Sequence, residues 1–144
     1  MFNILRPLIF KFSPEVAHSL AIKALKLNNI PYSKPKDNHI LETTFCEKKL
    51  SSPIGVAAGF DKNAEVYNPL FNLGFGFVEV GTITPKPQFG NPKPRVFRLE
   101  EDEALINRLG FNNSGSEQIS QTIKENNKKG FLGINIGPNK DSTN

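Results

Sequence analysis

The sequence predicts an α/β fold in which parallel strands alternate with helices. Residues 54–59, 77–83 and 131–137 each form an apolar run with the small or β-branched side chains of a buried strand. One helical pattern follows the first run, and another lies between the second and the third. This alternation is typical of parallel βα units, and 144 residues are enough to bury one core.

Two short helices are predicted ahead of these strands. In the first, we expect Pro7 in or near the first turn, because an interior proline removes a helical hydrogen bond. The second helix begins with Ser13 as N-cap, Pro14 at the first helical position and Glu15 in the first turn. Its apolar stripe is Val16, Leu20, Ala24 and Leu27, and Asn28, Asn29 and Pro31 are expected to end it.

These N-terminal helices are apolar and basic, with four basic residues and one acidic residue in 1–26. Such a pair can lie at a membrane interface, but the simpler interpretation from the residues alone is that both helices pack on the main domain. The segment is too interrupted for a transmembrane span of about 20 residues. A signal peptide is not predicted either, because Lys11, Glu15 and His18 break the apolar stretch.

Charge and composition exclude several classes of site. The net charge of +4 is modest and no nucleic-acid-binding motif is present, so no nucleic-acid partner is expected. Cys46 is the only cysteine, which excludes a disulfide framework and a cysteine-based metal site. His18 and His39 lie in different segments, so no metal site is expected, and a reduced, intracellular setting fits best.

Small or polar residues end each predicted strand. A linker at 31–40 and a hairpin within 43–56 precede the first strand, which ends in Ala58 and Gly59. Strand ends of this kind carry the active site in α/β folds, so we expect four polar residues to converge there and to suit a planar ligand with carbonyls and a carboxylate. The alternative is that Asp61 only caps a helix and that Lys62 is a solvated charge. The four converging residues are Lys62, Thr82, Asn107 and Asn135.

The segment 77–113 is the longest candidate for a binding loop. It has four prolines and a Gly90–Asn91 turn between 85 and 94, and a predicted hairpin from 95 to 107. A long, proline-stiffened loop rich in amide and guanidinium groups is more typical of a binding loop than of a connection. The alternative is a surface loop whose polar groups satisfy its own backbone.

Four strings, in this order, resemble dihydroorotate dehydrogenase, most closely its membrane-associated, quinone-dependent class. They are AAGFDKNAE (57–65), EVGTITPKPQFGNPKPRVFRL (79–99), INRLGFNN (106–113) and LGINIGPNK (132–140). The resemblance also includes FSPEVAH near the N-terminus and covers nearly the whole chain. No GxGxxG or P-loop motif is present, so the usual dinucleotide and nucleotide sites are not predicted.

The resemblance implies the N-terminal part of a (β/α)₈ TIM barrel, with about three of the eight strands. It divides the chain into a helical lid for membrane and quinone at 1–30, a linker at 31–42 and an incomplete FMN-binding barrel at 43–144. The family oxidises dihydroorotate to orotate in pyrimidine biosynthesis: a base removes one proton, a hydride passes to FMN, and a quinone reoxidises the flavin. A peripheral location at the cytoplasmic face of a membrane is implied, which reverses the preference for packing of the N-terminal helices.

The resemblance also assigns residues by matching position. Lys62 is expected to contact both the flavin and the substrate, because an ammonium can pair with the orotate carboxylate. His18 and Arg98 are expected near the quinone. The other flavin contacts are Ala58, Gly59, Phe60, Asp61, Thr82 and Asn135, and the substrate contacts are Lys62, Asn107, Arg108, Leu109, Gly110 and Phe111.

Some parts of the family pattern are missing from these residues. A complete barrel takes about 250 residues, and the catalytic base and the phosphate-binding loops are expected beyond Asn144. Pro138 also stands where a basic residue is expected. We therefore expect an N-terminal portion that is inactive alone; the alternative is a non-catalytic remnant or interaction module that keeps the helices and a partial sheet. Continuation of the coding sequence into the missing strands would distinguish the two.

Overall fold

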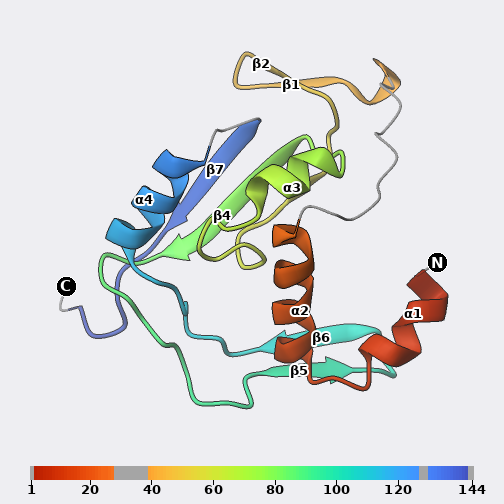
Figure 1. Cartoon of the computed structure of the whole chain (residues 1–144), viewed down its shortest axis with the longest axis vertical. Helices are drawn as coiled ribbons and strands as arrows, with labels where there is room; N and C mark the ends of the chain where they lie inside the picture. Colours follow the sequence, from red (N-terminus) through yellow and green to blue (C-terminus); the bar gives the residue numbers. More distant parts are fainter. Residues whose placement is uncertain (1, 28–38, 127–129, 143–144) are drawn as a thin grey trace.

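The computed structural model describes residues 2–27, 39–126 and 130–142. At its centre lies a parallel sheet in the order β3–β4–β7, which confirms the predicted α/β arrangement (Figure 1). The first strand is shorter than the predicted run 54–59, because the chain turns away after Val56 and enters a loop. The three strands are β3 (Gly55–Val56), β4 (Phe77–Ile83) and β7 (Phe131–Ile136).

Helices α3 (Tyr67–Asn72) and α4 (Ser116–Glu125) pack on one face of the sheet. Val78 and Val80 of β4 are fully buried there. Burying such side chains stabilises the fold by about 1.5–3 kcal/mol each. Side chains alternate along a strand, so Glu79 points to the opposite face, which the two helices leave open for a site. The core of the helix-covered face also contains Tyr67, Leu70 and Ile119.

The loop between β3 and α3 is shaped by Asp61. Its carboxylate accepts backbone hydrogen bonds from Glu65 at 2.7 Å and from Val66 at 2.8 Å. Asp61 is 1% exposed, and burial raises its pKa. Asp61 thus caps a turn, whereas the N-cap position of α3 is Val66, so the helix begins later than a cap at Asp61 implies.

Helices α1 (Phe2–Ile9) and α2 (Pro14–Lys26) precede the sheet. Pro7 lies inside α1, so the prediction that it lies near the first turn is wrong. A helix of this length tolerates it because only one backbone hydrogen bond is lost near the end. Ser13 and Pro14 occupy the predicted N-cap and first helical positions, although the Ser13 side chain makes no capping bond. The predicted stop at 28–31 lies outside the described residues.

The apolar stripe of α2 faces away from the sheet. Val16 and Leu20 are 47% and 45% exposed, and Leu27 is 71% exposed. Leu25 and Ile22 instead contact the core, so the helix docks through a different face from the one the stripe indicates. Within the described ranges, no helix is long and apolar enough to cross a membrane.

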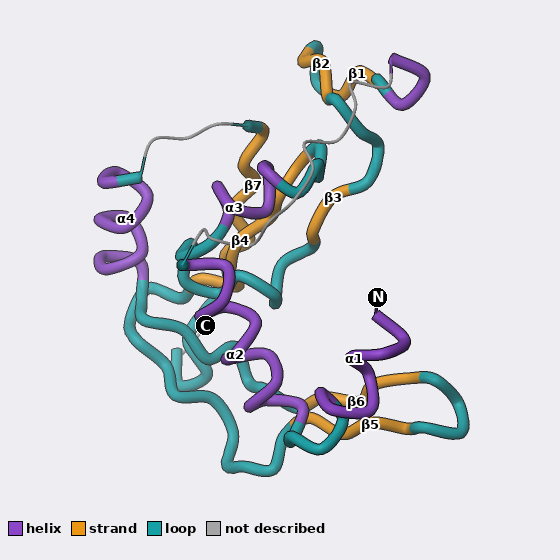
Figure 2. Tube along the Cα trace, turned by 45° about the vertical axis from the view of Figure 1, so that its right-hand side comes forward, coloured by secondary structure: helices purple, strands orange, loops and turns teal. Residues whose placement is uncertain are grey.

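Two antiparallel hairpins lie outside the central sheet, as predicted. The second hairpin flanks α2 on the side away from the sheet, with α1 beside it (Figure 2). Most of the linker falls outside the described residues, and its end forms a short 3₁₀ helix, η1 (His39–Leu41). The hairpin strands are β1 (Thr43–Phe45), β2 (Lys48–Leu50), β5 (Val96–Leu99) and β6 (Ala104–Asn107).

Candidate functional site

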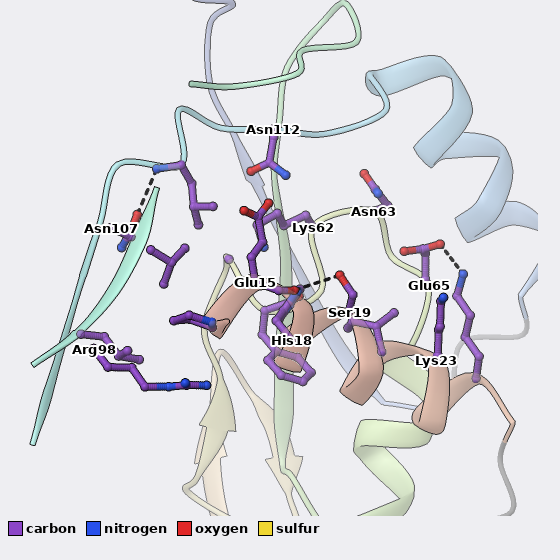
Figure 3. Close-up of a pocket in the computed structure, with 18 residues that line it drawn as sticks. Glu15, His18, Ser19, Lys23, Lys62, Asn63, Glu65, Arg98, Asn107 and Asn112 are labelled. Carbon is purple, nitrogen blue, oxygen red and sulfur yellow. Dashed lines mark hydrogen bonds and ion pairs between the residues drawn. The ribbon is translucent and has the colours of Figure 1, made fainter. Parts of the chain in front are cut away.

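Two hollows open where the parallel strands end. The sheet-side pocket, of about 490 Å³, lies between the ends of β3 and β4 and the segment 107–112. The helix-side groove, of about 600 Å³, lies between α2 and the hairpin β5–β6 (Figure 3). The two hollows therefore share a wall, which consists of Gly59, Lys62, Asn107, Leu109 and Asn112.

Glycines make the floor of the sheet-side pocket flat. Gly59 has φ +106°, and a Cβ there would meet no atom within 4 Å, so its missing side chain leaves open space. Gly81 has φ +108°, and a Cβ there would lie 2.4 Å from the Asn135 carbonyl oxygen. Only glycine therefore permits the close approach of β4 and β7 at this point.

A chain of hydrogen bonds crosses the three strands beneath this floor. The Thr82 hydroxyl donates to Asn135 Oδ1 at 2.7 Å, and Asn135 Nδ2 donates to Glu79 Oε1 at 3.2 Å. The other Glu79 oxygen accepts from the Ala58 backbone at 3.5 Å. This network fixes the orientation of Thr82 and Asn135. Glu79 was not predicted as a site residue, and its only sequence signal is an acidic side chain between two buried valines.

Two polar groups in the shared wall lack a partner among the described residues. Lys62 makes no hydrogen bond or ion pair there; burial lowers its pKa, and the nearby Glu15 carboxylate opposes that shift. The Asn112 Oδ1 atom is buried and accepts no hydrogen bond. A half-buried cation without a counter-charge and a buried acceptor are costly unless a ligand satisfies them, so the wall suits a polar, anionic molecule. Asn112 lies just outside the predicted substrate segment.

His18 and Arg98 both line the helix-side groove. His18 Nε2 lies 2.7 Å from the Phe60 carbonyl oxygen, and its ring meets the Phe60 ring edge-on at 5.3 Å. Burial lowers the pKa of His18, which favours the neutral imidazole that donates to Phe60. Arg98 donates to the Phe12 carbonyl at 2.8 Å and stacks over the Phe10 ring, so it holds the turn between α1 and α2.

The structure brings most of the predicted residues together. The predicted substrate segment 107–111 lines the sheet-side pocket. Phe60 lines the helix-side groove instead, Asp61 lines neither hollow, and Asn135 lies behind Thr82. The pocket also contains four of the predicted flavin contacts, Ala58, Gly59, Lys62 and Thr82.

The model of the family described as dihydroorotate dehydrogenase matches residues 40–144. The chain belongs to the dihydroorotate dehydrogenase family. It is 52% identical over 134 residues to the dihydroorotate dehydrogenase (quinone) of Rhodospirillum rubrum, an alignment that covers 93% of this chain and 36% of the relative. It is 50% identical over 143 residues to the protein of the same name from Erythrobacter litoralis, covering 99% and 41%. The resemblance predicted from the four strings is confirmed.

Solved structures agree with this family assignment. The dihydroorotate dehydrogenase of Eimeria tenella in complex with ferulenol superposes with a TM-score of 0.85 and 43% identity, over 92% of this chain and 38% of that chain. The ligand-free form gives the same TM-score and identity. The chain thus spans less than half the length of these dehydrogenases, and over that part it has their fold.

Proposed function

We propose that this chain is the N-terminal part of an FMN-dependent, quinone-reducing dihydroorotate dehydrogenase with a (β/α)₈ barrel. One observation carries the proposal: Lys62 presents a half-buried ammonium, without an ion-pair partner in the described part of the chain, to both hollows. Dihydroorotate carries one carboxylate, which such a cation would bind in a charge-assisted pair. The chain would then take part in oxidation of dihydroorotate to orotate.

The sheet-side pocket fits a flat ring with polar edges, as FMN has. Gly59 leaves room for the ring, and Thr82 and Asn135 are held in fixed orientations beside it. When bound, FMN would accept a hydride from the substrate and pass electrons to a quinone. Lys62 would hold the substrate carboxylate, while the segment from Asn107 to Phe111 would enclose the substrate. Ala58 is the remaining flavin contact in this pocket, whereas the flavin contacts expected at Phe60 and Asp61 are not part of the proposal, because Phe60 lines the other hollow and Asp61 lines neither.

The helix-side groove is the proposed route for the quinone. His18 and Arg98 would provide its polar contacts, and Ile22, Val96 and Leu105 its apolar wall. Residues 1–30 would form the lid and rest on the cytoplasmic surface of a membrane, followed by a linker at 31–42 and the barrel part at 43–144. The support is a set of exposed apolar side chains on α1, α2 and the turn between them: Leu5, Leu8, Ile9, Phe12, Val16 and Leu20.

The test uses protein expressed from its complete coding sequence and purified in detergent. We expect a flavin absorption spectrum with stoichiometric FMN, and reduction of a ubiquinone analogue that depends on dihydroorotate. NAD⁺ in place of the quinone is the control for the electron acceptor and should not support turnover. Protein that holds no flavin and does not oxidise dihydroorotate would overturn the proposal and favour the non-catalytic interaction module.

A further inference from the structure

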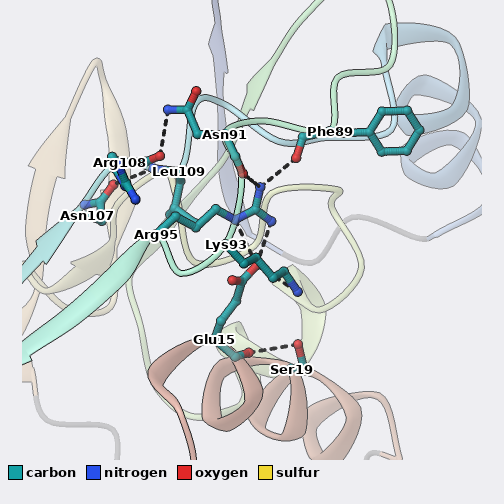
Figure 4. A network of polar contacts seen from close by, with 9 residues as sticks. All are labelled: Glu15, Ser19, Phe89, Asn91, Lys93, Arg95, Asn107, Arg108 and Leu109. Atoms are coloured by element: carbon teal, nitrogen blue, oxygen red, sulfur yellow. Dashed lines mark hydrogen bonds and ion pairs between the residues drawn. The ribbon is translucent and has the colours of Figure 1, made fainter.

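A buried ion pair joins helix α2 to the proline-rich loop between β4 and β5. Glu15 Oε1 accepts from Arg95 Nη2 at 2.6 Å and from Arg95 Nε at 3.1 Å (Figure 4). The Arg95 side chain is only 8% exposed and that of Glu15 is 21% exposed. The Arg95 guanidinium holds the pKa of Glu15 below its usual value. This contact therefore connects the start of α2 to a residue that lies far from it in the sequence.

The same guanidinium shapes the turn at 89–91. Arg95 Nη1 donates to the Phe89 carbonyl at 2.7 Å and to the Asn91 carbonyl at 3.0 Å. One planar group thus binds the helix on one side and the turn on the other. A lysine has a single, flexible ammonium and cannot reproduce this fork.

The turn at 89–91 is hydrogen-bonded to the proposed substrate segment. The Asn91 backbone N–H donates to the Leu109 carbonyl at 3.0 Å, and the side-chain Nδ2 of Asn91 donates to the Arg108 carbonyl at 2.8 Å. The Arg108 amide donates to the Arg95 carbonyl at 2.8 Å. The turn and the substrate segment are closely packed, because a Cβ at Gly90 would lie 2.2 Å from the Leu109 carbonyl oxygen. A displacement of Arg95 must therefore shift or loosen Arg108 and Leu109.

We propose that Arg95 is a positioning residue that makes the shape of the substrate segment 107–111 depend on the docked position of α2. Without Glu15, the Arg95 guanidinium is buried without a counter-charge, so its side chain must reorganise. That reorganisation breaks its hydrogen bonds to the turn at 89–91. The helix that borders the groove would thus influence dihydroorotate binding through a residue that touches neither the substrate nor the flavin. This inference rests on the proposed function of the segment.

Lys93 provides a matched control. Its ammonium lies 3.5 Å from the same Glu15 oxygen, but its side chain is 70% exposed and lines neither hollow. Lys93→Gln therefore removes a charge beside Glu15 and leaves the fork of Arg95 intact. A change that follows from local charge alone should appear in this variant, and one that follows from the fork should not.

The experiment measures the two half-reactions separately in holoenzyme expressed from its complete coding sequence. Flavin reduction by dihydroorotate is followed by stopped flow without quinone, and reoxidation by quinone is followed afterwards. Glu15→Ala should raise the dihydroorotate concentration for half-maximal reduction by roughly 5- to 150-fold, the usual range for coupling between two sites. Arg95→Lys should do the same, the double variant should be no worse than either single variant, and Lys93→Gln should match the parent.

Hydrogen exchange gives a readout that needs no activity. A peptide covering 105–113 should exchange faster in Glu15→Ala and Arg95→Lys than in the parent protein or in Lys93→Gln. If both variants alter only the reoxidation by quinone and leave exchange in this peptide unchanged, Arg95 merely docks the helix and the inference is wrong. A parent protein without flavin or turnover would instead refute the proposed function, and the exchange comparison would still test the coupling.

Discussion

Lys62→Met separates the ligand-binding role of Lys62 from its effect on stability. Methionine has about the same length as lysine and carries no charge, so the substitution removes the ammonium and keeps most of the packing. The position of Lys62 costs folding free energy: burial lowers its pKa, which means that the folded state disfavours the charged form. We therefore expect the variant to be more stable than the parent when no ligand is bound, and much less active.

The expected loss of activity follows from the proposed pair with the substrate carboxylate. Removing one partner of a buried charge pair costs several kcal/mol, and about 2–4 kcal/mol suits a group that is only half-buried. Since 1.36 kcal/mol corresponds to a factor of ten, kcat/KM should fall by about 30- to 1,000-fold. The effect should be largest on KM, because the carboxylate is bound in the ground state as well.

The stability effect has a predicted pH dependence. The cost of burying the ammonium is fully present below the folded-state pKa and is relieved as pH rises from there toward the usual lysine pKa of 10.5. The gain in Tm of Lys62→Met over the parent, both without ligand, should therefore shrink between pH 7 and pH 10. Lys93→Met, at an exposed lysine, is the control. A variant with the activity of the parent, or with a lower Tm at pH 7, would refute the reasoning.

Three further predictions concern other parts of the site. The His18 imidazole should titrate in NMR spectra with a midpoint below 6.5, and a midpoint above 6.5 contradicts this. The free energy of unfolding should fall as pH drops below 6.5, because the unfolded state binds the proton more strongly there than the folded state does. Deletion of residues 1–30 from the complete enzyme should abolish quinone reduction and lipid association but keep bound flavin, measured by absorbance and vesicle sedimentation. Gly81→Ala should lower the free energy of unfolding by about 2–5 kcal/mol in denaturant titrations, and Gly59→Ala by less, because only the former adds a steric clash.

Local patterns predicted the strands and hairpins well, because each depends on neighbouring residues. The runs at 77–83 and 131–137 become β4 and β7, and the hairpin from 95 to 107 forms as predicted. The first strand and the start of α3 were predicted less well. The start of α3 depends on Asp61, whose carboxylate binds backbone groups four and five residues away instead of capping the helix itself.

The sequence predicted the site residues that lie at strand ends, and it missed those whose roles depend on side chains far away in the sequence. Lys62 and Thr82 meet at one pocket because the parallel strands β3 and β4 end at one edge of the sheet, and Asn107 joins them from the hairpin β5–β6. The role of Glu79 depends on a partner 56 residues away and that of Arg95 on one 80 residues away. No pattern in a single sequence indicates such pairs.

Helix α2 reverses the usual arrangement of an amphipathic helix. Besides the packing of Ile22 and Leu25 on the core, its contacts with the rest of the protein are polar. Glu15 binds Arg95, His18 binds Phe60, and Lys26 binds Glu65. These three residues lie on one helical face, whereas the apolar stripe that begins at Val16 is exposed. A soluble helix normally buries its stripe, whereas α2 docks through the face on which Ile22 and Leu25 pack on the core beside these polar groups.

The polar contacts of α2 have a consequence for how the helix can act. Charge pairs and single hydrogen bonds have strict geometry, whereas apolar contacts tolerate sliding, so a small shift of α2 changes discrete contacts. Glu15 reaches the segment 107–111 through Arg95, and His18 reaches the loop after β3 directly. Both loops line the shared wall of the two hollows. An exposed apolar stripe covered by lipid would hold the helix from one side, and these polar contacts would transmit its position to the site from the other.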